Sequence, residues 1–262
     1  MLIYLLIVVY NKDCRELTDK FLNLKAAGAS VIVYDNGHRT YDNSQVCKDA
    51  GVVYLGGNGN KGLSVAYNET ISYCLRFSEK GMICLFDDDT SIPPDYVSAV
   101  MQYAEDGSSI LLPLLYSGET LISPAVLKKD FHCRFFSSFE EAQSYRGSSF
   151  TALNSGMAIP LKLFLDYHYD ERLFLDGIDH HFMADMADKK VPFRVMNFQL
   201  EHHLSAMEKP SLESALHRFN IYQKDIRVFA EKRWRRILFR RILKLTLQYH
   251  TFAFVKKFLK GA

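Results

Sequence analysis

Four short apolar runs, interspersed with stretches of helical spacing, constrain the fold of this chain more than any other sequence feature. They cover residues 2–10, 30–34, 52–55 and 82–86. The first run is apolar almost throughout, which is typical of a strand that is buried on both faces. Strands that alternate with helices form a parallel sheet through right-handed crossovers. The sequence therefore predicts an α/β fold with a mostly parallel sheet flanked by helices.

The second half of the chain divides into two parts. Beyond residue 107 the pattern weakens into short strands and Ser-rich connections, and a last strand is predicted over residues 191–197. From Ser211 onward the spacing is helical throughout. We therefore predict one α/β domain over residues 1–207 and a basic helical extension over residues 208–262.

Charge is divided unevenly between these parts. Residues 232–262 hold ten Lys and Arg and no acid, whereas residues 1–231 hold 22 basic and 30 acidic residues, a formal charge of −8. The hydrophobic fraction of 48% excludes a disordered chain. The five cysteines are scattered without a CxxC pair, which indicates reduced thiols in a cytosolic protein.

No apolar run is long enough to cross a membrane. The run over residues 2–10 is apolar, but a membrane-spanning helix needs about twenty such residues. It also lacks the basic start and the small-residue cleavage site of a signal peptide. Arg240, Arg241 and Lys244 interrupt the apolar residues of the extension. We expect a cytoplasmic protein.

Three consecutive aspartates, Asp87 to Asp89, directly follow the fourth predicted strand. Adjacent carboxylates repel one another unless a cation or another positive group lies among them. Mg²⁺ and Mn²⁺ bind carboxylate oxygens and keep positions open for substrate phosphates. The alternative is a solvated loop. Ligands bind at the carboxyl ends of parallel strands, so Asp35, at the end of the second strand, is also a candidate site residue.

The loop from Gly57 to Gly62 fits the pattern G-x-G-x-x-G, but it follows the third strand, and the next acidic strand end is Asp87. A dinucleotide-binding loop follows the first strand of its unit. Lys61 precedes the last glycine, so the loop is not a Walker motif either. We interpret it as a loop that holds a nucleotide through backbone amides, with a plain turn as the alternative.

Two later strings contain candidate residues. Asp176 and Asp179 stand three positions apart, so they share one face of a helix or line its start, although such acids also serve as N-caps. His202 and His203 follow the last predicted strand. A histidine there can supply a metal ligand, although a lone histidine is more often structural.

Taken in order over roughly residues 3 to 205, these features resemble the inverting glycosyltransferases of family 2, which have the Rossmann-like GT-A fold. Asn60, Gly62, Ala66 and Asn68 match the spacing of the family's N-x-G-x-x-x-A-x-N stretch. The resemblance implies that the donor nucleotide and sugar are bound by Tyr10, Asp35, Asn60, Lys61, Gly62, Asn68, Asp87, Asp88, Asn154 and Gly156.

The resemblance also implies a metal site. Asp87-Asp88-Asp89 resembles the DxD element that holds Mn²⁺ or Mg²⁺ and the donor diphosphate. Asp89, Asp87 and His202 would be the ligands. His203 is the alternative ligand. The Leu204-Ser205 that follows favours His202.

The catalytic base of the family corresponds to Asp179, and Asp176 is our second choice. The family usually has Glu or Val before this position, and here the residue is Ile178. The residues around this pair follow the form F-x-D-x-x-D, which is similar to bacterial rhamnosyltransferases of cell-surface polysaccharide assembly.

The function that this resemblance implies is metal-dependent, inverting sugar transfer in O-antigen or capsule synthesis. The donor would be a UDP- or dTDP-sugar, and the acceptor a saccharide or a lipid-linked saccharide. A sugar nucleotidyltransferase is one alternative, but such enzymes usually have a glycine-rich basic loop after the first strand, and residues 10–14 contain no glycine. A non-catalytic module that binds nucleotide-sugars is the other.

The basic extension has three interpretations. Nucleic-acid binding suits its charge, but the acidic body carries no recognition motif, so we expect no nucleic-acid partner. A hairpin packed on the first domain, or on a second copy in a homodimer, would bury its apolar residues. An amphipathic helix on an anionic membrane would use the cations as well. We favour the last, which places the protein peripherally on the inner face of the cell membrane.

Overall fold

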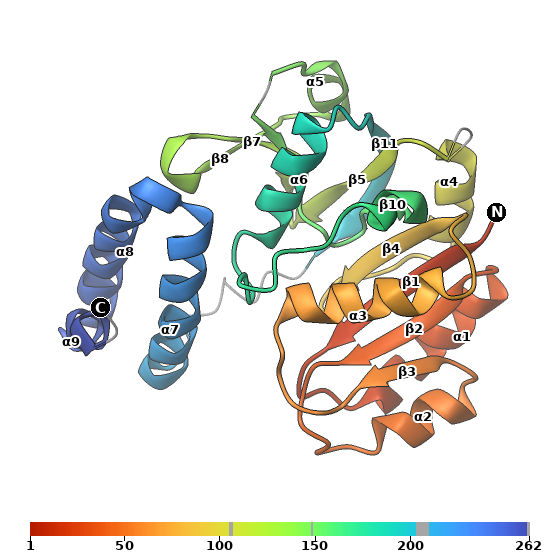
Figure 1. The fold of residues 1–262 in the computed structure, drawn as a ribbon, viewed down its shortest axis with the longest axis horizontal. Coiled ribbons are helices and arrows are strands. Elements are labelled where there is room, and N and C mark those ends of the chain that lie inside the picture. Colours follow the sequence, from red (N-terminus) through yellow and green to blue (C-terminus); the bar gives the residue numbers. More distant parts are fainter. Residues whose placement is uncertain (105–106, 148, 203–209, 261–262) are drawn as a thin grey trace.

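The computed structural model describes residues 1–104, 107–147, 149–202 and 210–260 (Figure 1). The predicted domain boundary at residues 207 and 208, as well as His203, Leu204 and Ser205, lie outside the described residues. Within the described residues, the helices fall short of the length and apolar character needed to span a membrane.

An eight-stranded sheet forms the centre of the first domain, in the order β11-β5-β10-β4-β1-β2-β3, with β6 paired to β5. The pairs within β1 to β4 are parallel, as is β5 with β11, whereas β10 is antiparallel to both of its neighbours. The predicted mostly parallel sheet is confirmed. Its strands are β1 (Ile3–Val9), β2 (Ser30–Asp35), β3 (Val53–Gly56), β4 (Met82–Asp87), β5 (Ile110–Ser117), β6 (Thr120–Ser123), β10 (Ala158–Pro160) and β11 (Phe193–Glu201).

Helices cover both faces of this sheet, so β1 is buried on both sides. Alternate residues of β1 enter two different cores: Leu5 and Ile7 pack with α1 and α4, and Leu6 and Val8 with α3 and α6. The helices are α1 (Thr18–Ala26), α2 (Asn43–Asp49), α3 (Leu63–Leu75), α4 (Tyr96–Tyr103), α5 (Phe139–Ser144) and α6 (Ile178–Asp188), and 3₁₀ turns cover Cys14–Leu17, Lys129–Phe131 and Leu161–Leu165.

The last strand of the sheet differs from its prediction. β11 begins at Phe193 and continues to Glu201, four residues beyond the predicted end at Asn197. Its register against β5 shifts between Val195 and Gln199, and the residues after the shift are mostly polar, so no apolar run marks them. A second, three-stranded sheet consists of β7 (Ala125–Leu127), β8 (Cys133–Phe135) and β9 (Phe150–Thr151).

The C-terminal helices form a separate cluster beside the sheet domain (Figure 1). Their own core includes Phe219, Ile226, Leu238 and Phe254. Phe229, at the end of α7, packs on Phe131 of the first domain, so the extension has the packed-hairpin contacts that were one of its interpretations. The helices are α7 (Leu212–Phe229), α8 (Trp234–Tyr249) and α9 (Ala253–Lys260), with a 3₁₀ turn over Glu231–Arg233.

Candidate active site

The strand ends that carry the predicted residues meet at one edge of the sheet. Asp35 pairs in register with Val9 and with Gly56, and Asp87 pairs with Val8. The ends of β1, β2, β3 and β4 therefore lie side by side. This edge brings Asp35, Asp87 and the start of the glycine loop together, as expected for a parallel sheet.

Asp35 lies at the buried end of this edge. One carboxylate oxygen accepts a hydrogen bond from the N–H of Gly37 at 3.0 Å. The other accepts from the Asn43 amide at 2.9 Å and from the Tyr54 hydroxyl at 3.1 Å. These donors stabilise a carboxylate that is only 2% exposed. Burial, followed by the charge of Asp35, raises the pKa of the Tyr54 hydroxyl, which keeps it a donor.

Side chains inside and outside the glycine loop hold it in place. The N–H of Lys61 donates to the Asn36 side chain at 2.9 Å, and the N–H of Gly62 donates to the Asn60 side chain at 3.0 Å. The Lys61 ammonium binds Glu69 at 2.7 Å. Two of the backbone amides that we expected to hold a nucleotide therefore already donate to side chains within the protein. The nucleotide contacts of Lys61 and Gly62 stay predictions.

Asn68 has a structural contact where the resemblance implies a donor contact. Its amide donates to the carbonyl of Tyr169 at 2.9 Å and accepts from the Tyr169 N–H at 3.0 Å. It also donates to Glu171 at 3.1 Å. Both ends of this buried amide are used to hold the segment that leads towards α6, so the donor contact predicted for Asn68 lacks a free group.

The aspartates after β4 are partly exposed and close to one another. Burial, together with the charges of Asp89, Asp179 and Asp88, raises the pKa of Asp87 to about 7. Burial also raises the pKa of Asp88, which Lys12 opposes. This group of carboxylates is therefore short of positive charge. It also includes Asp179, which six strands, two α-helices and two 3₁₀ turns separate from Asp87 in the sequence.

Asp89 and His202 form the second part of this edge. The His202 Nδ1 lies 3.5 Å from an Asp89 oxygen and 2.7 Å from the Thr90 hydroxyl, and a β-bridge joins Thr90 to His202. That Asp89 oxygen is buried without a hydrogen-bond partner. The Thr90 hydroxyl is also 2.7 Å from that of Ser155. A buried carboxylate oxygen and an imidazole are ligand types that fit a divalent cation.

The described residues contain no group of three or more His, Cys, Asp or Glu side chains arranged to hold a metal. Two lysines that the sequence analysis did not single out brace the loop instead. Lys12 donates to the Asp88 carbonyl at 3.2 Å, and Lys20 donates to the Thr90 carbonyl at 3.1 Å.

Asp179 lies in the first turn of α6 and is half-buried. Burial raises the pKa of this carboxyl, and the nearby Asp176 adds to the shift. The charge of His180 and hydrogen bonds from the N–H groups of Asp179 and Asn154 oppose it. The result is a carboxylate that holds a proton more strongly than an ordinary aspartate does.

Asp176, our second choice for the base, precedes α6 and contacts the extension. Both of its carboxylate oxygens accept hydrogen bonds from the Arg218 guanidinium of α7, one of them at 2.6 Å. Asp176 therefore links the first domain to the extension through Arg218. Its role as an alternative base stays a prediction.

Asp225 of α7 makes a second link, which the sequence analysis missed. This fully buried carboxylate accepts hydrogen bonds from the N–H groups of Phe174, Leu175 and Asp176 at 2.8 to 2.9 Å. Gly177 follows with φ of +80°, and a Cβ there would lie 2.9 Å from the Phe229 ring. We name residues 174–177 the anchored loop. The sequence signal that could have indicated this link is an acid, Asp225, on the apolar face of a helix.

The remaining predicted residues line the same edge or support it. Tyr10, at the end of β1, is 51% exposed and free to contact a ligand. Asn154 is buried, and its side-chain oxygen has no hydrogen-bond partner. Gly156 has φ of +78° and donates to the Leu85 carbonyl at 2.7 Å, and a Cβ there would collide with Leu200. Gly156 thus serves close packing beside the site.

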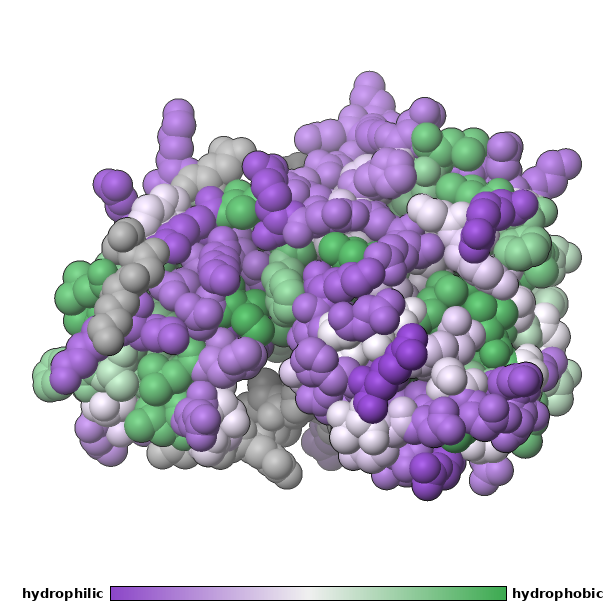
Figure 2. Space-filling view, turned by 60° about the horizontal axis from the view of Figure 1, so that its bottom comes forward, coloured by the Kyte–Doolittle hydropathy of each residue, from purple (hydrophilic) through white to green (hydrophobic). Residues whose placement is uncertain are grey.

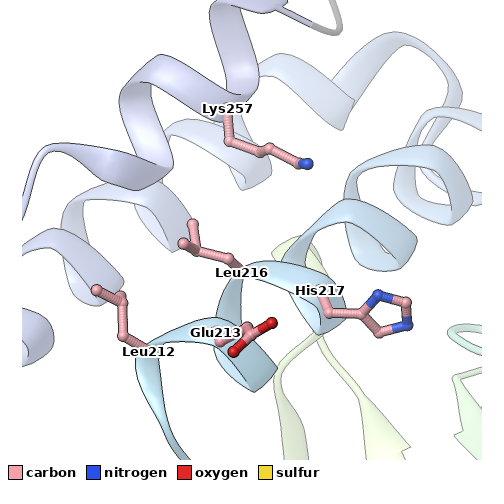
Figure 3. Close-up of a pocket in the computed structure, with 5 residues that line it drawn as sticks. All are labelled: Leu212, Glu213, Leu216, His217 and Lys257. Carbon is pink, nitrogen blue, oxygen red and sulfur yellow. The ribbon is translucent and has the colours of Figure 1, made fainter.

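Two cavities involve the extension. One, of 520 Å³, lies between α7 and α9, and the side chains that line it include Leu212, Leu216 and Lys257 (Figure 3). The other, of 390 Å³, lies between the anchored loop and α8.

The sequence profile of the family described as Glycosyl transferase family 2 matches residues 4–164. Among solved structures, S. aureus TarS is similar at 14% identity and a TM-score of 0.55, over 87% of this chain and 40% of that one. TarS 1–349 is 16% identical with a TM-score of 0.54, over 89% and 73%. Its complex with UDP-GlcNAc is 13% identical with a TM-score of 0.52, over 87% and 67%.

These structural similarities concern the fold, and they confirm the predicted GT-A-like architecture. This chain spans 40% of the length of the longer TarS chain. No curated protein sequence matches it.

Proposed function

The chain belongs to glycosyl transferase family 2, and from this premise we propose that it transfers a sugar from a UDP- or dTDP-sugar to a saccharide acceptor with inversion. Family membership confirms the predicted enzyme class, a glycosyltransferase. The observation that supports the proposed reaction is the convergence of the Asp87 and Asp179 carboxylates at the sheet edge. Burial, followed by the charges of Asp89, Asp179 and Asp88, raises the pKa of Asp87 to about 7.

We infer that Mn²⁺ or Mg²⁺ is bound at Asp89 and His202, with Asp87 as a further ligand. The unpartnered oxygen of Asp89 next to the His202 imidazole supports this assignment. So does the shortage of positive charge among the aspartates, because a divalent cation would offset their repulsion. Such a cation stabilises the negative charge that develops on a departing diphosphate.

The residues of the chain itself then have distinct tasks. Asp179 accepts the proton of the acceptor hydroxyl while the oxygen attacks the anomeric carbon. A carboxylate whose pKa is raised by burial is a stronger base than an exposed one. The new bond forms on the face opposite the bond to the diphosphate, so the anomeric configuration inverts. Asp35 and Tyr10 border the nucleotide at the far end of the same edge.

The donor and the biological role are finer parts of this proposal. The described complex of TarS with UDP-GlcNAc supports a UDP-sugar as the first donor to test. The F-x-D-x-x-D form around Asp179 favours a rhamnosyltransferase-like enzyme of cell-surface polysaccharide assembly, acting on a saccharide or lipid-linked acceptor.

The outward face of the extension supports the proposed membrane contact. Ile237, Leu238, Ile242 and Leu245 of α8 are buried, whereas Phe239, Leu243 and Leu247 stand four residues apart on its exposed side. Hydrophobic patches lie among hydrophilic side chains over these helices, at the left of Figure 2. An apolar stripe flanked by cations suits an anionic membrane at the inner face of the cell membrane, and a homodimer is the alternative.

The test is a screen of UDP- and dTDP-sugars with the purified protein, with and without Mn²⁺. The proposed function predicts metal-dependent release of the nucleoside diphosphate, which increases when an acceptor is present. Release of pyrophosphate from a nucleoside triphosphate and a sugar phosphate would identify a nucleotidyltransferase instead. Donor binding without turnover, together with a wild-type chain that transfers to no acceptor, would identify a binding module.

A further inference from the structure

The cavity of 390 Å³ beside the anchored loop joins the two parts of the protein. Asp176 and His180 line it from the first domain, and Tyr222, Arg240, Arg241 and Lys244 line it from the extension. Lys244 lies one turn of α8 beyond Arg240 and Arg241, and all three cations line this space. We name this space the basic cavity.

Three cationic side chains line the basic cavity. Among its described lining residues Asp176 is the only carboxylate, and Arg218 already binds both of its oxygens. The Arg241 guanidinium lies 5.4 Å from the centre of the Tyr222 ring, which orients it without neutralising it. Arginine and lysine side chains in such a concave site attract phosphate, and the planar guanidinium binds it through paired hydrogen bonds.

The position of the basic cavity points to the acceptor. Asp176, Gly177 and His180 line it, and Asp179 lies between them in the chain. The His180 ring is fixed by a contact of 2.7 Å from its Nδ1 to the Thr151 hydroxyl and by stacking on Phe229. Aromatic faces of this kind pack against sugar rings. A molecule in the basic cavity therefore lies against the segment that carries the proposed base.

The donor diphosphate has a different place. The aspartates after β4 would repel a diphosphate unless a cation lies between them, whereas the basic cavity needs no cation to bind an anion. We propose that the basic cavity binds a phosphate group of the acceptor saccharide and so selects phosphorylated acceptors. This proposal rests on the proposed function and adds the substrate class of the acceptor.

The experiment measures binding of glucose 1-phosphate to the full chain by calorimetry, with saturating UDP and Mn²⁺ so that the donor site is filled. Glucose is the uncharged control probe. We expect glucose 1-phosphate to bind more tightly than glucose, and its affinity to fall at least about tenfold in the double variant Arg241→Gln/Lys244→Gln. The single variant Lys244→Gln, which changes one exposed side chain, should show part of this loss.

A matched variant controls for the loss of two charges. Arg235→Gln/Lys256→Gln removes one cation each from α8 and α9, outside the basic cavity, and should leave glucose 1-phosphate binding unchanged. UDP affinity, measured separately, should be the same in all variants. If UDP fails to bind the wild type, the proposed function fails. If UDP binds but glucose 1-phosphate binds no better than glucose, or equally to both double variants, only the acceptor proposal is overturned.

A second arm identifies the source of the phosphate. Vesicles of phosphatidylglycerol are offered to the same variants with and without glucose 1-phosphate. We expect the Arg241→Gln/Lys244→Gln variant to bind vesicles as the matched control does. If it loses vesicle binding but keeps its affinity for glucose 1-phosphate, the basic cavity binds lipid headgroups, and the acceptor proposal is wrong.

Discussion

The edge of the sheet and the face of the C-terminal helices handle charge in opposite ways. At the sheet edge, Asp87, Asp88 and Asp89 lie close together, and burial, followed by the charges of neighbouring carboxylates, raises the pKa of Asp87. On α8, Arg240, Arg241 and Lys244 line one cavity. In our proposals, the first region needs a cation before it can hold a diphosphate, whereas the second can hold an anion directly. The anchored loop lies between the two regions, because it precedes Asp179 and lines the basic cavity.

Removing the proposed base tests the sheet edge most severely. We expect Asp179→Asn to lower the transfer rate by about two to three orders of magnitude, because amides cannot accept the acceptor proton. Donor affinity should change little. Steady-state kinetics and donor calorimetry measure the two effects. Asp188→Asn, at the exposed end of the same helix, is the matched control and should keep the wild-type rate.

The pH dependence follows from the same residue. Asp179 must be deprotonated to act, and burial raises its pKa, so activity should decline with falling pH at higher values than an ordinary aspartate would give. The transfer rate should therefore be highest above the raised pKa of Asp179 and should fall as the pH drops below it. A pH profile of single-turnover rates with saturating metal shows this. A rate that stays constant down to the ordinary aspartate range would exclude Asp179 as the base.

Removing the contacts between Asp225 and the anchored loop should have the next largest effect. Asp225→Ala leaves three partly buried backbone N–H groups without an acceptor, and we expect it to lower the free energy of unfolding by about 3 kcal/mol. The transfer rate should fall as well, with donor affinity kept, because the anchored loop precedes Asp179. Glu213→Ala, exposed on the same helix, is the control for denaturant unfolding. Asp225→Asn keeps an acceptor and should lose less.

The next prediction concerns Asp89, whose buried carboxylate oxygen has no hydrogen-bond partner. Asp89→Ala should weaken UDP binding in Mn²⁺ by at least about tenfold and leave the weak metal-free binding as it is. Calorimetry with and without Mn²⁺ gives both values. Equal affinity of the wild type for UDP in the two buffers would contradict a metal at this edge.

The outer stripe of α8 should have the smallest effect. The double variant Phe239→Ser/Leu243→Ser removes apolar area that would enter the membrane interface, so we expect about tenfold weaker sedimentation with anionic vesicles. Leu22→Ser/Phe77→Ser removes exposed apolar side chains from the first domain and should bind normally. If the stripe variant instead converts a dimer to a monomer in sedimentation velocity, the stripe is a subunit contact.

Local patterns in the sequence predicted the sheet edge but not the contacts between Asp225 and the anchored loop. β1, β2 and β4 were predicted within about one residue because their apolar runs end abruptly at polar residues. Asp35, Asp87 and Asp179 followed from those ends and from the family's order of motifs. Asp225 binds residues 49 to 51 positions away, a contact that only tertiary packing creates.

Pattern matching also has a physical limit. Asn68 fits the family spacing, yet its amide binds Tyr169, which lies 101 positions further along the chain. A match in spacing fixes where a residue lies on its helix, and the partner that reaches it depends on the rest of the fold. The polar end of β11 was missed for a related reason, because its register shift removes the regular alternation.

The distance in sequence between Asp176 and Asp225 has a consequence for synthesis. The three hydrogen bonds that Asp225 accepts from the anchored loop can form only after α7 has been synthesised, later than the aspartates of the sheet edge. Until then the loop before Asp179 lacks this support. A nascent chain that ends before α7 should therefore contain the strand ends of the sheet edge without a fixed anchored loop.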